Sequence, residues 1–173
     1  MADALRTRVG CPVDPISGSN LAFANYVIDL STETLTFVFQ TDEAVTITTL
    51  GFRYGARTGT PPTYQISLQG VTTAGAADGT IKGATNNCLA TFTPPADTTI
   101  NSKWQWKTAG ESYTTARGEW LAIVIAYSSG TIDASNNSSS TSNLGLTAIT
   151  GAPYAITASR LTTMPCFGYQ SAS

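Results

Sequence analysis

Hydrophobic and polar residues alternate along most of this chain, with the two-residue period of a β-strand that has one buried face. Tyr64, Ile66 and Leu68 share one face of such a segment, and polar residues separate them. The residues from 35 to 39 and from 26 to 30 alternate in the same way. No segment carries apolar residues at the spacing of an amphipathic helix. The pattern therefore predicts an all-β fold with about eight to ten strands.

Two places in the pattern predict how neighbouring strands are arranged. The short connection from Leu30 to Thr34 indicates a hairpin between the strands on either side of it. Further along, Val45 and Ile47 keep one phase of the alternation, whereas Leu50 begins the other. Because such a slip requires an extra residue in one strand, we expect a β-bulge near Thr48.

The segment from Trp120 to Tyr127, WLAIVIAY, is apolar on both faces. Its length and its β-branched residues favour a central strand that other layers cover on both sides. Residues 128–143, rich in Ser and Asn, follow it and predict a long exposed loop. Glycine and proline at 55–62, and glycine at 72–83, indicate turns rather than phosphate-binding loops, since neither segment ends in G-K-[ST].

Strands of this number and spacing predict an antiparallel β-sandwich of jelly-roll type. The 173 residues fit one domain. We divide the chain into an N-terminal arm or edge segment, residues 1–20, and a single sandwich domain, residues 21–173. The first segment fits either an arm laid over a neighbouring subunit or a strand of its own sandwich, and the sequence leaves both open.

Charge is sparse and evenly spread. Asp, Glu, Lys and Arg make up 12% of the residues, against about 25% in ordinary soluble domains. The nine basic residues are scattered and the net charge is −2, so no stripe for tracking phosphates exists and nucleic acid is not an expected partner. The first residues lack an apolar run, and no stretch approaches the length of a membrane span, so neither a signal peptide nor membrane insertion is expected.

The chain contains no histidine, which removes Ser-His-Asp and Cys-His catalysis and most transition-metal sites. A carboxylate pair is the remaining enzymatic route, but the acidic residues concerned lie in or beside turns, where carboxylates commonly cap backbone amides. A calcium site of loop oxygens stays open, although no D-x-D-x-D-G spacing supports one. We therefore expect no enzyme and no cofactor. The acidic residues are Asp78, Asp97, Glu111, Glu119 and Asp133.

The three cysteines, Cys11, Cys88 and Cys166, are far apart and lack the C-x-x-C spacing of a metal or redox site. We expect three reduced, buried thiols. A single bridge from Cys11 to Cys166, which would join the two ends of the chain, is the alternative.

Aromatic residues gather between positions 104 and 120. Indole and phenol rings stack on the flat faces of sugars, so Trp104, Trp106 and Tyr113 are candidate contacts for a glycan or another partner. Packing in the core is the competing and favoured interpretation, most of all for Trp120, because it begins the most apolar strand. Trp104 and Trp106 are the pair least committed to the core, since polar residues flank them.

Several segments together resemble a known family: YGARTGTPPTYQISLQGV from Tyr54 to Val71, then DGTIKG, ATFTPPADTT, SKWQWKT and YTTARGEWLAIVIAY. Over roughly Thr46 to Tyr127 they look like a jelly-roll module of structural proteins of tailed bacteriophages. Within that group the sequence is most similar to capsid decoration (cement) proteins, including those of cyanobacterial phages. Binding domains of tail fibres and baseplates are also similar.

The resemblance implies a virion protein on the capsid surface that is made in the host cytoplasm. Its partners would be the major capsid protein and further copies of itself, in a homo-oligomer such as a trimer. The alternative is a carbohydrate- or receptor-binding module of a tail fibre or baseplate, in which Trp104, Trp106 or Tyr113 provides the stacking surface. Copy number separates the two, because a cement protein is present in hundreds of copies.

Overall fold

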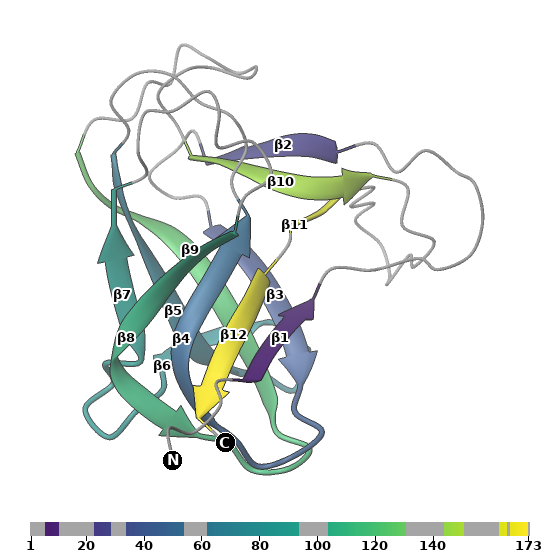
Figure 1. Ribbon diagram of the computed structural model, residues 1–173, viewed down its shortest axis with the longest axis vertical. Coiled ribbons are helices and arrows are strands. Elements are labelled where there is room, and N and C mark those ends of the chain that lie inside the picture. The colour runs from purple at the N-terminus through teal and green to yellow at the C-terminus, as the bar shows by residue number, and fades with distance from the viewer. Residues whose placement is uncertain are drawn as a thin grey trace.

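The computed structural model describes residues 6–10, 23–28, 34–53, 62–93, 104–130, 144–150, 163–165 and 167–172. Every regular element within these ranges is a β-strand, and none is a helix (Figure 1). The strands are β1 (Arg6–Gly10), β2 (Phe23–Ile28), β3 (Thr34–Gln40), β4 (Thr46–Arg53), β5 (Thr63–Val71), β6 (Ala77–Ile81), β7 (Leu89–Phe92), β8 (Trp104–Thr114), β9 (Trp120–Ser129), β10 (Leu144–Thr150), β11 (Thr163–Pro165) and β12 (Phe167–Ala172).

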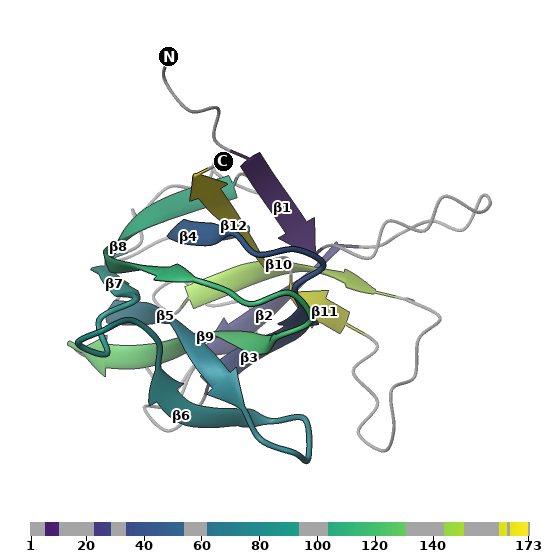
Figure 2. The same cartoon turned by 90° about the horizontal axis from the view of Figure 1, so that it is seen from below.

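Two antiparallel sheets pack face to face, as the end-on view in Figure 2 shows. The first, which we call the β4 sheet, has the order β1-β12-β4-β8. The second, the β9 sheet, has the order β3-β9-β5-β6, and β7 also pairs with β5. A smaller sheet, β11-β10-β2, lies across one end of the sandwich (Figure 1). The predicted all-β antiparallel sandwich is confirmed.

The core lies between the β4 and β9 sheets and follows the alternation of the sequence. Tyr64, Ile66 and Leu68 of β5 are fully buried, and they meet the equally buried Leu50 and Phe52 of β4. Each such side chain stabilises the fold by about 1.5–3 kcal/mol through the apolar surface that it removes from water. The period of the pattern thus identifies the buried face of the central strands correctly.

Aromatic rings hold the two sheets together along the side formed by β3 and β12. Phe37 of β3 stacks against Phe167 of β12 with ring centroids 5.9 Å apart. Phe39 and Tyr169 form the next pair, with centroids 5.3 Å apart. Stacked pairs add about 0.5–1.5 kcal/mol to the burial of their area. These contacts fix β3 in the β9 sheet, opposite β12.

The predicted bulge at Thr48 is confirmed. In the ladder between β12 and β4, the consecutive residues Gln170 and Ser171 pair with Thr49 and Ile47, so Thr48 is the extra residue of β4. Ile47 and Leu50 are both fully buried although they are three positions apart, an odd spacing that a regular strand would place on opposite faces.

The predicted hairpin across Leu30–Thr34 is wrong. β2 pairs with β10, and β3 pairs with β9, so the strands on either side of this connection belong to different sheets. Alternation shows which face of a strand is buried but does not name its partner. Phe37 stacks on Phe167 and Phe39 stacks on Tyr169. These contacts place β3 opposite β12, although β2 is the strand that precedes β3 in the sequence.

β9 is the central strand that the sequence predicts, and it lies between β3 and β5. It continues to Ser129, so the predicted loop at 128–143 begins two residues too early; positions 131–143 lie outside the described residues. Most of the predicted turn at 55–62 lies outside them as well. So do residues 1–5 and 11–20 of the N-terminal segment, whereas residues 6–10 form β1 at the edge of the β4 sheet.

Candidate functional site

Trp106 lies on the outer face of the β4 sheet rather than in the core. It pairs with Gly51 of β4, and its indole covers the position where a side chain of residue 51 would stand. Gly51 alternates with the buried Leu50 and Phe52, so it faces outward. The indole is half-buried, and it packs against the backbone of Gly51. The structure thus places Trp106 on a surface, although not as a freely exposed ring.

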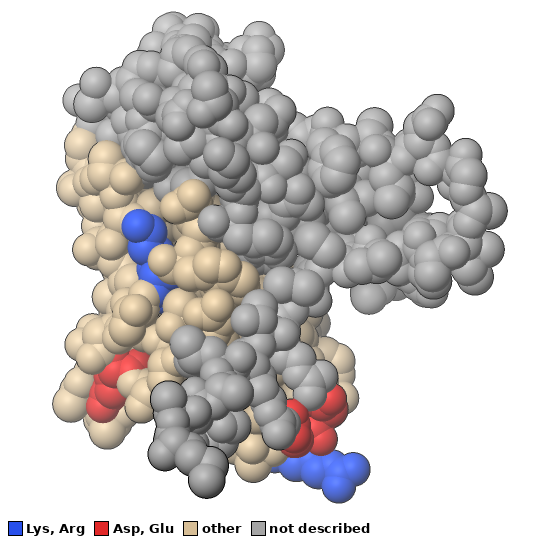
Figure 3. All heavy atoms as spheres, in the orientation of Figure 1, with Lys and Arg blue, Asp and Glu red and all other residues tan. Residues whose placement is uncertain are grey.

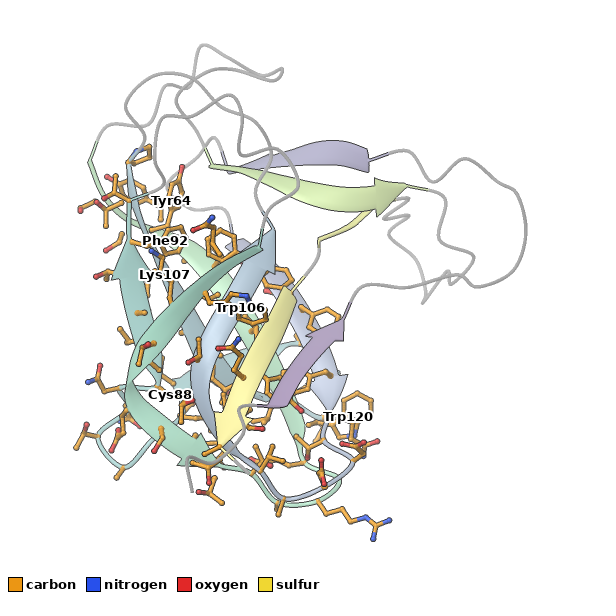
Figure 4. All side chains as sticks on the ribbon, viewed as in Figure 1. Tyr64, Cys88, Phe92, Trp106, Lys107 and Trp120 are labelled. Carbon is orange, nitrogen blue, oxygen red and sulfur yellow. The ribbon has the colours of Figure 1, made fainter. Side chains whose placement is uncertain are left out.

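Polarity is inverted along the first part of β8. Gln105 pairs with Phe52 and Lys107 pairs with Leu50, so the polar residues share the side of the core positions. The Lys107 ammonium lies 5.9 Å from the ring centroid of Phe92, close enough for a cation–π contact, and Figure 4 shows the two side chains together. Trp104 opens the same strand and pairs with Arg53, but its side chain lies outside the described part.

Tyr113 belongs to a different environment from Trp106. It pairs with Ile47, and the irregularity in β8 between Thr108 and Tyr113 turns it toward the core. Its hydroxyl donates a hydrogen bond of 2.7 Å to Glu119 Oε1. Trp106 and Tyr113 therefore do not form one stacking surface.

Tyr113, Glu119 and Lys82 form a cluster that joins the two sheets at one end. Lys82, next to β6, donates to Glu119 Oε1 at 3.2 Å, and its ammonium lies 5.3 Å from the ring centroid of Tyr113. The amide of Ala116 donates to Glu119 Oε2 at 3.0 Å. One carboxylate thus accepts hydrogen bonds from a turn, a β4-sheet strand and a residue beside β6.

The pKa values in this cluster follow from those contacts. Burial opposes the charge of Glu119, but the hydrogen bonds from Ala116, Tyr113 and Lys82 outweigh it, so the pKa of this carboxyl lies below its ordinary value. Burial also opposes the charge of Lys82, and the carboxylate of Glu119 outweighs it and raises the pKa of the ammonium. Burial, then the hydrogen bond to Glu119, raises the pKa of Tyr113. The charged pair is stable through the neutral range.

Three of the carboxylates that the sequence places in or beside turns accept hydrogen bonds from backbone amides, as predicted. Asp78 Oδ1 accepts from the amide of Thr80 at 2.7 Å, and Glu111 Oε2 accepts from the amide of Thr85 at 2.9 Å. Glu119 accepts from Ala116 in the same way. Asp97 and Asp133 lie outside the described residues. Nor do any three His, Cys, Asp or Glu side chains in the described ranges gather into a group that could hold a metal ion.

Trp120 is the exposed aromatic, contrary to the expectation that it packs in the core. It is 55% exposed and is the one large hydrophobic side chain among the described residues that is exposed. Leu121, Ile123 and Ile125 point inward, so Trp120 shares the outward phase with Ala122 and Val124. The sequence holds this signal, because the inward positions of β9 carry the large residues and the outward ones carry small residues apart from Trp120.

A shallow groove of about 640 Å³ runs along the outer face of the β9 sheet, on the side to which Trp120 points. Its floor consists of outward side chains of β3 and β9, and the turn before β6, with β6 itself, forms one wall. None of its lining residues carries a charge: Thr34, Thr36, Val38, Gln69, Gly75, Ala76, Ala77, Gly79, Val124 and Ala126.

No known protein family matches this chain, and no curated protein is significantly similar to it. In the described ranges no helix is long and apolar enough to span a membrane. On the face drawn in Figure 3, the described surface carries only a few charged side chains, and the only place where acidic and basic ones adjoin in this view is its lower right.

Proposed function

We propose that this protein is a structural protein of a virion, a capsid decoration protein that binds major capsid subunits and stabilises the shell. The order of the strands is the observation that supports it most. Without the small sheet, eight strands remain if β6 is counted with its neighbour β7: β1, β3, β4, β5, β7, β8, β9 and β12.

This order favours the jelly-roll type. A jelly roll folds eight strands into two sheets through two Greek keys, so that most consecutive strands alternate between sheets. Here β1, β4, β8 and β12 lie in one sheet and β3, β5, β7 and β9 in the other, with the first strand beside the last. The region that resembles phage modules, Thr46 to Tyr127, spans β4 to β9 of this arrangement.

A binding role suits the described surface better than a catalytic one. The three described turn carboxylates each cap a backbone amide, and the outer face of the β9 sheet carries hydroxyls, amides and apolar groups without charge. Charged residues are depleted from the centres of protein interfaces in the same way. A decoration protein acts by mass action, since it binds the assembled shell and thereby stabilises it. Closed symmetric assembly of its copies, as in a trimer, gives several contacts at once.

The experiment is a count of copies per particle by quantitative mass spectrometry of purified virions, normalised to the major capsid protein. Hundreds of copies, together with heads that lose thermal stability when the protein is stripped and regain it on readdition, are the expected result. A handful of copies confined to tails contradicts the proposal and supports the tail-fibre alternative.

The alternative, a carbohydrate- or receptor-binding module with Trp104, Trp106 or Tyr113 as the stacking ring, stays a prediction, and the side chain of Trp104 lies outside the described residues. Trp106 packs on Gly51, Tyr113 is bonded to Glu119, and the two do not share a surface. One observation still favours stacking on a sugar, namely the exposed Trp120 on the other sheet.

A further inference from the structure

The outer face of the β9 sheet combines a groove with an exposed aromatic ring. The groove has a volume of about 640 Å³ and includes Thr36 of β3 with Val124 and Ala126 of β9. Trp120 lies on the same face of the same strand and is 55% exposed. In Figure 4 it stands at the lower end of the molecule, well apart from Trp106. Trp120 is exposed, whereas Val124 in the lining of the groove is only 5% exposed.

The spacing of these features suits an extended ligand. Trp120 and Val124 are four residues apart on one strand, which places them about 13 Å apart at the usual rise of a β-strand. Gln40 and Val38 of β3 lie beside Trp120 and Ala122 in the ladder. Ala122 is fully buried, so the exposed Gln40 and the half-buried Val38 provide the surface between the ring and the groove. A chain of several linked sugar rings, rather than a single ring, covers this distance.

The chemistry of the face is uncharged. β3 and β9 contain no Asp, Glu, Lys or Arg, and neither does the lining of the groove. Asp78 is the nearest acidic residue along β6, and it lies instead against Gly70. A charged ligand would therefore be taken out of water without an opposite charge to pair with, which is unfavourable. A neutral ligand avoids this cost.

We propose that this face binds a neutral oligosaccharide, with Trp120 stacked on one sugar ring and the groove holding the units that follow. Exposed hydroxyls of Thr34 and Thr36 line one side and can donate to or accept from sugar hydroxyls. Val38, Val124 and Ala126 offer apolar contact for the C–H faces of the rings. This face is the uncharged surface that also supports the capsid-decoration proposal, but the two are tested separately, because sugar binding requires only the folded chain and no capsid.

The test uses the full chain on an array of linear, uncharged oligosaccharides of two to six glucose, mannose or galactose units, followed by titration calorimetry with the best binder. Trp120→Ala should weaken binding about tenfold or more, because it removes the stacking ring. Trp120→Phe should retain most of the affinity. Thr36→Lys should also abolish binding, since it fills the groove with a long charged side chain.

Thr114→Ala is the matched control, because Thr114 is an exposed hydroxyl of β8 in the other sheet. It should bind like the wild type, and all variants should give the unfolding curve of a folded chain. A blank array, or binding that Trp120→Ala and Thr36→Lys leave intact, overturns the proposal. So does a blank array together with self-association that Trp120→Ala abolishes, because the face is then a contact between copies of the chain.

Discussion

The indole of Trp106 lies directly over the α-carbon of Gly51 on the neighbouring strand. A Cβ atom at position 51 would overlap Cε3 and Cζ3 of the ring. The indole therefore occupies the space that any larger residue at this position would need for its side chain. Gly51 is buried in consequence, although it faces outward. An aromatic residue on an outer face can therefore be half-buried without belonging to the core.

Gly51→Ala should lower the free energy of unfolding by about 1–3 kcal/mol, because the added methyl group displaces a large ring. The usual gain from replacing a glycine, about 0.4–1 kcal/mol through the unfolded chain, offsets only part of this cost. Chemical denaturation of the single and double variants measures the effect. In a Trp106→Ala background the same substitution should be close to neutral. An equal cost in both backgrounds would show that the ring is not the cause.

Glu119→Gln should reduce stability by about 1–2 kcal/mol at pH 7, because it removes the charge that Lys82 and Tyr113 bond. The pKa of Glu119 is lowered by folding, so its contribution is complete above the ordinary carboxyl pKa of 4.5 and is lost as the pH falls through the lower folded value. Folding raises the pKa values of Lys82 and Tyr113, so the stability that their protonated forms contribute is lost only on the alkaline side, above about pH 10.

Unfolding curves of wild type and Glu119→Gln at pH 7, 5, 4 and 3 test the acid limit. The two proteins should converge in stability as the pH falls below 4.5. Tyr113→Phe serves as the control, since it deletes one hydrogen bond and keeps the ion pair of Lys82 and Glu119. A constant difference between wild type and Glu119→Gln down to pH 3 would argue against the assigned role of the carboxylate.

The alternation of apolar residues was enough to predict which faces are buried. Tyr64, Ile66 and Leu68 are buried as the period requires, and the phase slip located the bulge at Thr48. Both are properties of a single strand, and a strand's two faces are written in its own sequence. The capping roles of Asp78 and Glu119 are equally local, because each carboxylate accepts from an amide two or three residues away. Glu111 instead accepts from Thr85, 26 residues away, so its partner could not be read from the sequence.

Features that depend on which strands pair could not be predicted in this way. The wrong hairpin at Leu30–Thr34 and the missed contact of Trp106 with Gly51 both require knowledge of neighbours far away in sequence. The link from Lys82 to Glu119 spans 37 residues. Trp120 is a different case. The run from Trp120 to Tyr127 is apolar on both faces, which predicted that its first residue is buried, but Trp120 is exposed.

Cys88 is fully buried, and burial, followed by the nearby charge of Glu111, raises the pKa of its thiol to about 11. The thiolate is the reactive form, so native Cys88 should not react with an aromatic disulfide reagent at pH 8. A Cys11→Ser/Cys166→Ser variant isolates this thiol. It should react stoichiometrically after unfolding in guanidinium chloride. Rapid reaction of the native variant would contradict the burial of Cys88.

Gly10 pairs directly with Phe167 in the β1–β12 ladder, and Cys11 and Cys166 are the next residues from that pair. These two cysteines lie outside the described residues. The bridge between them stays a prediction from the sequence; if it forms, mild oxidation with diamide joins the two cysteines, each thiol losing one proton and one electron to the reagent. Peptide mapping by mass spectrometry without reduction identifies the bond. A bridge that includes Cys88, or two thiols that remain free, would contradict the expectation.

Thr41 ties the turn before β4 to the turn before β9. Its hydroxyl donates to the carbonyl of Ala116 at 2.6 Å and accepts from the amide of Glu119 at 3.1 Å, and the side chain is almost fully buried. Thr41→Val keeps the shape but leaves both partners without this oxygen, which should cost about 1–3 kcal/mol of stability. Thr114→Val, an exposed strand position, should be nearly neutral.

Hydrogen exchange gives the local measurement for Thr41→Val. The amide of Glu119 should exchange faster in the variant. Amides of the central β9 residues, such as Ile123, should change only as much as the free energy of global unfolding changes. Since Glu119 also holds Lys82 and Tyr113, loosening this turn should weaken that cluster too, and Thr41→Val and Glu119→Gln should be less than additive. Full additivity would mean that the turn and the ion pair stabilise the sandwich independently.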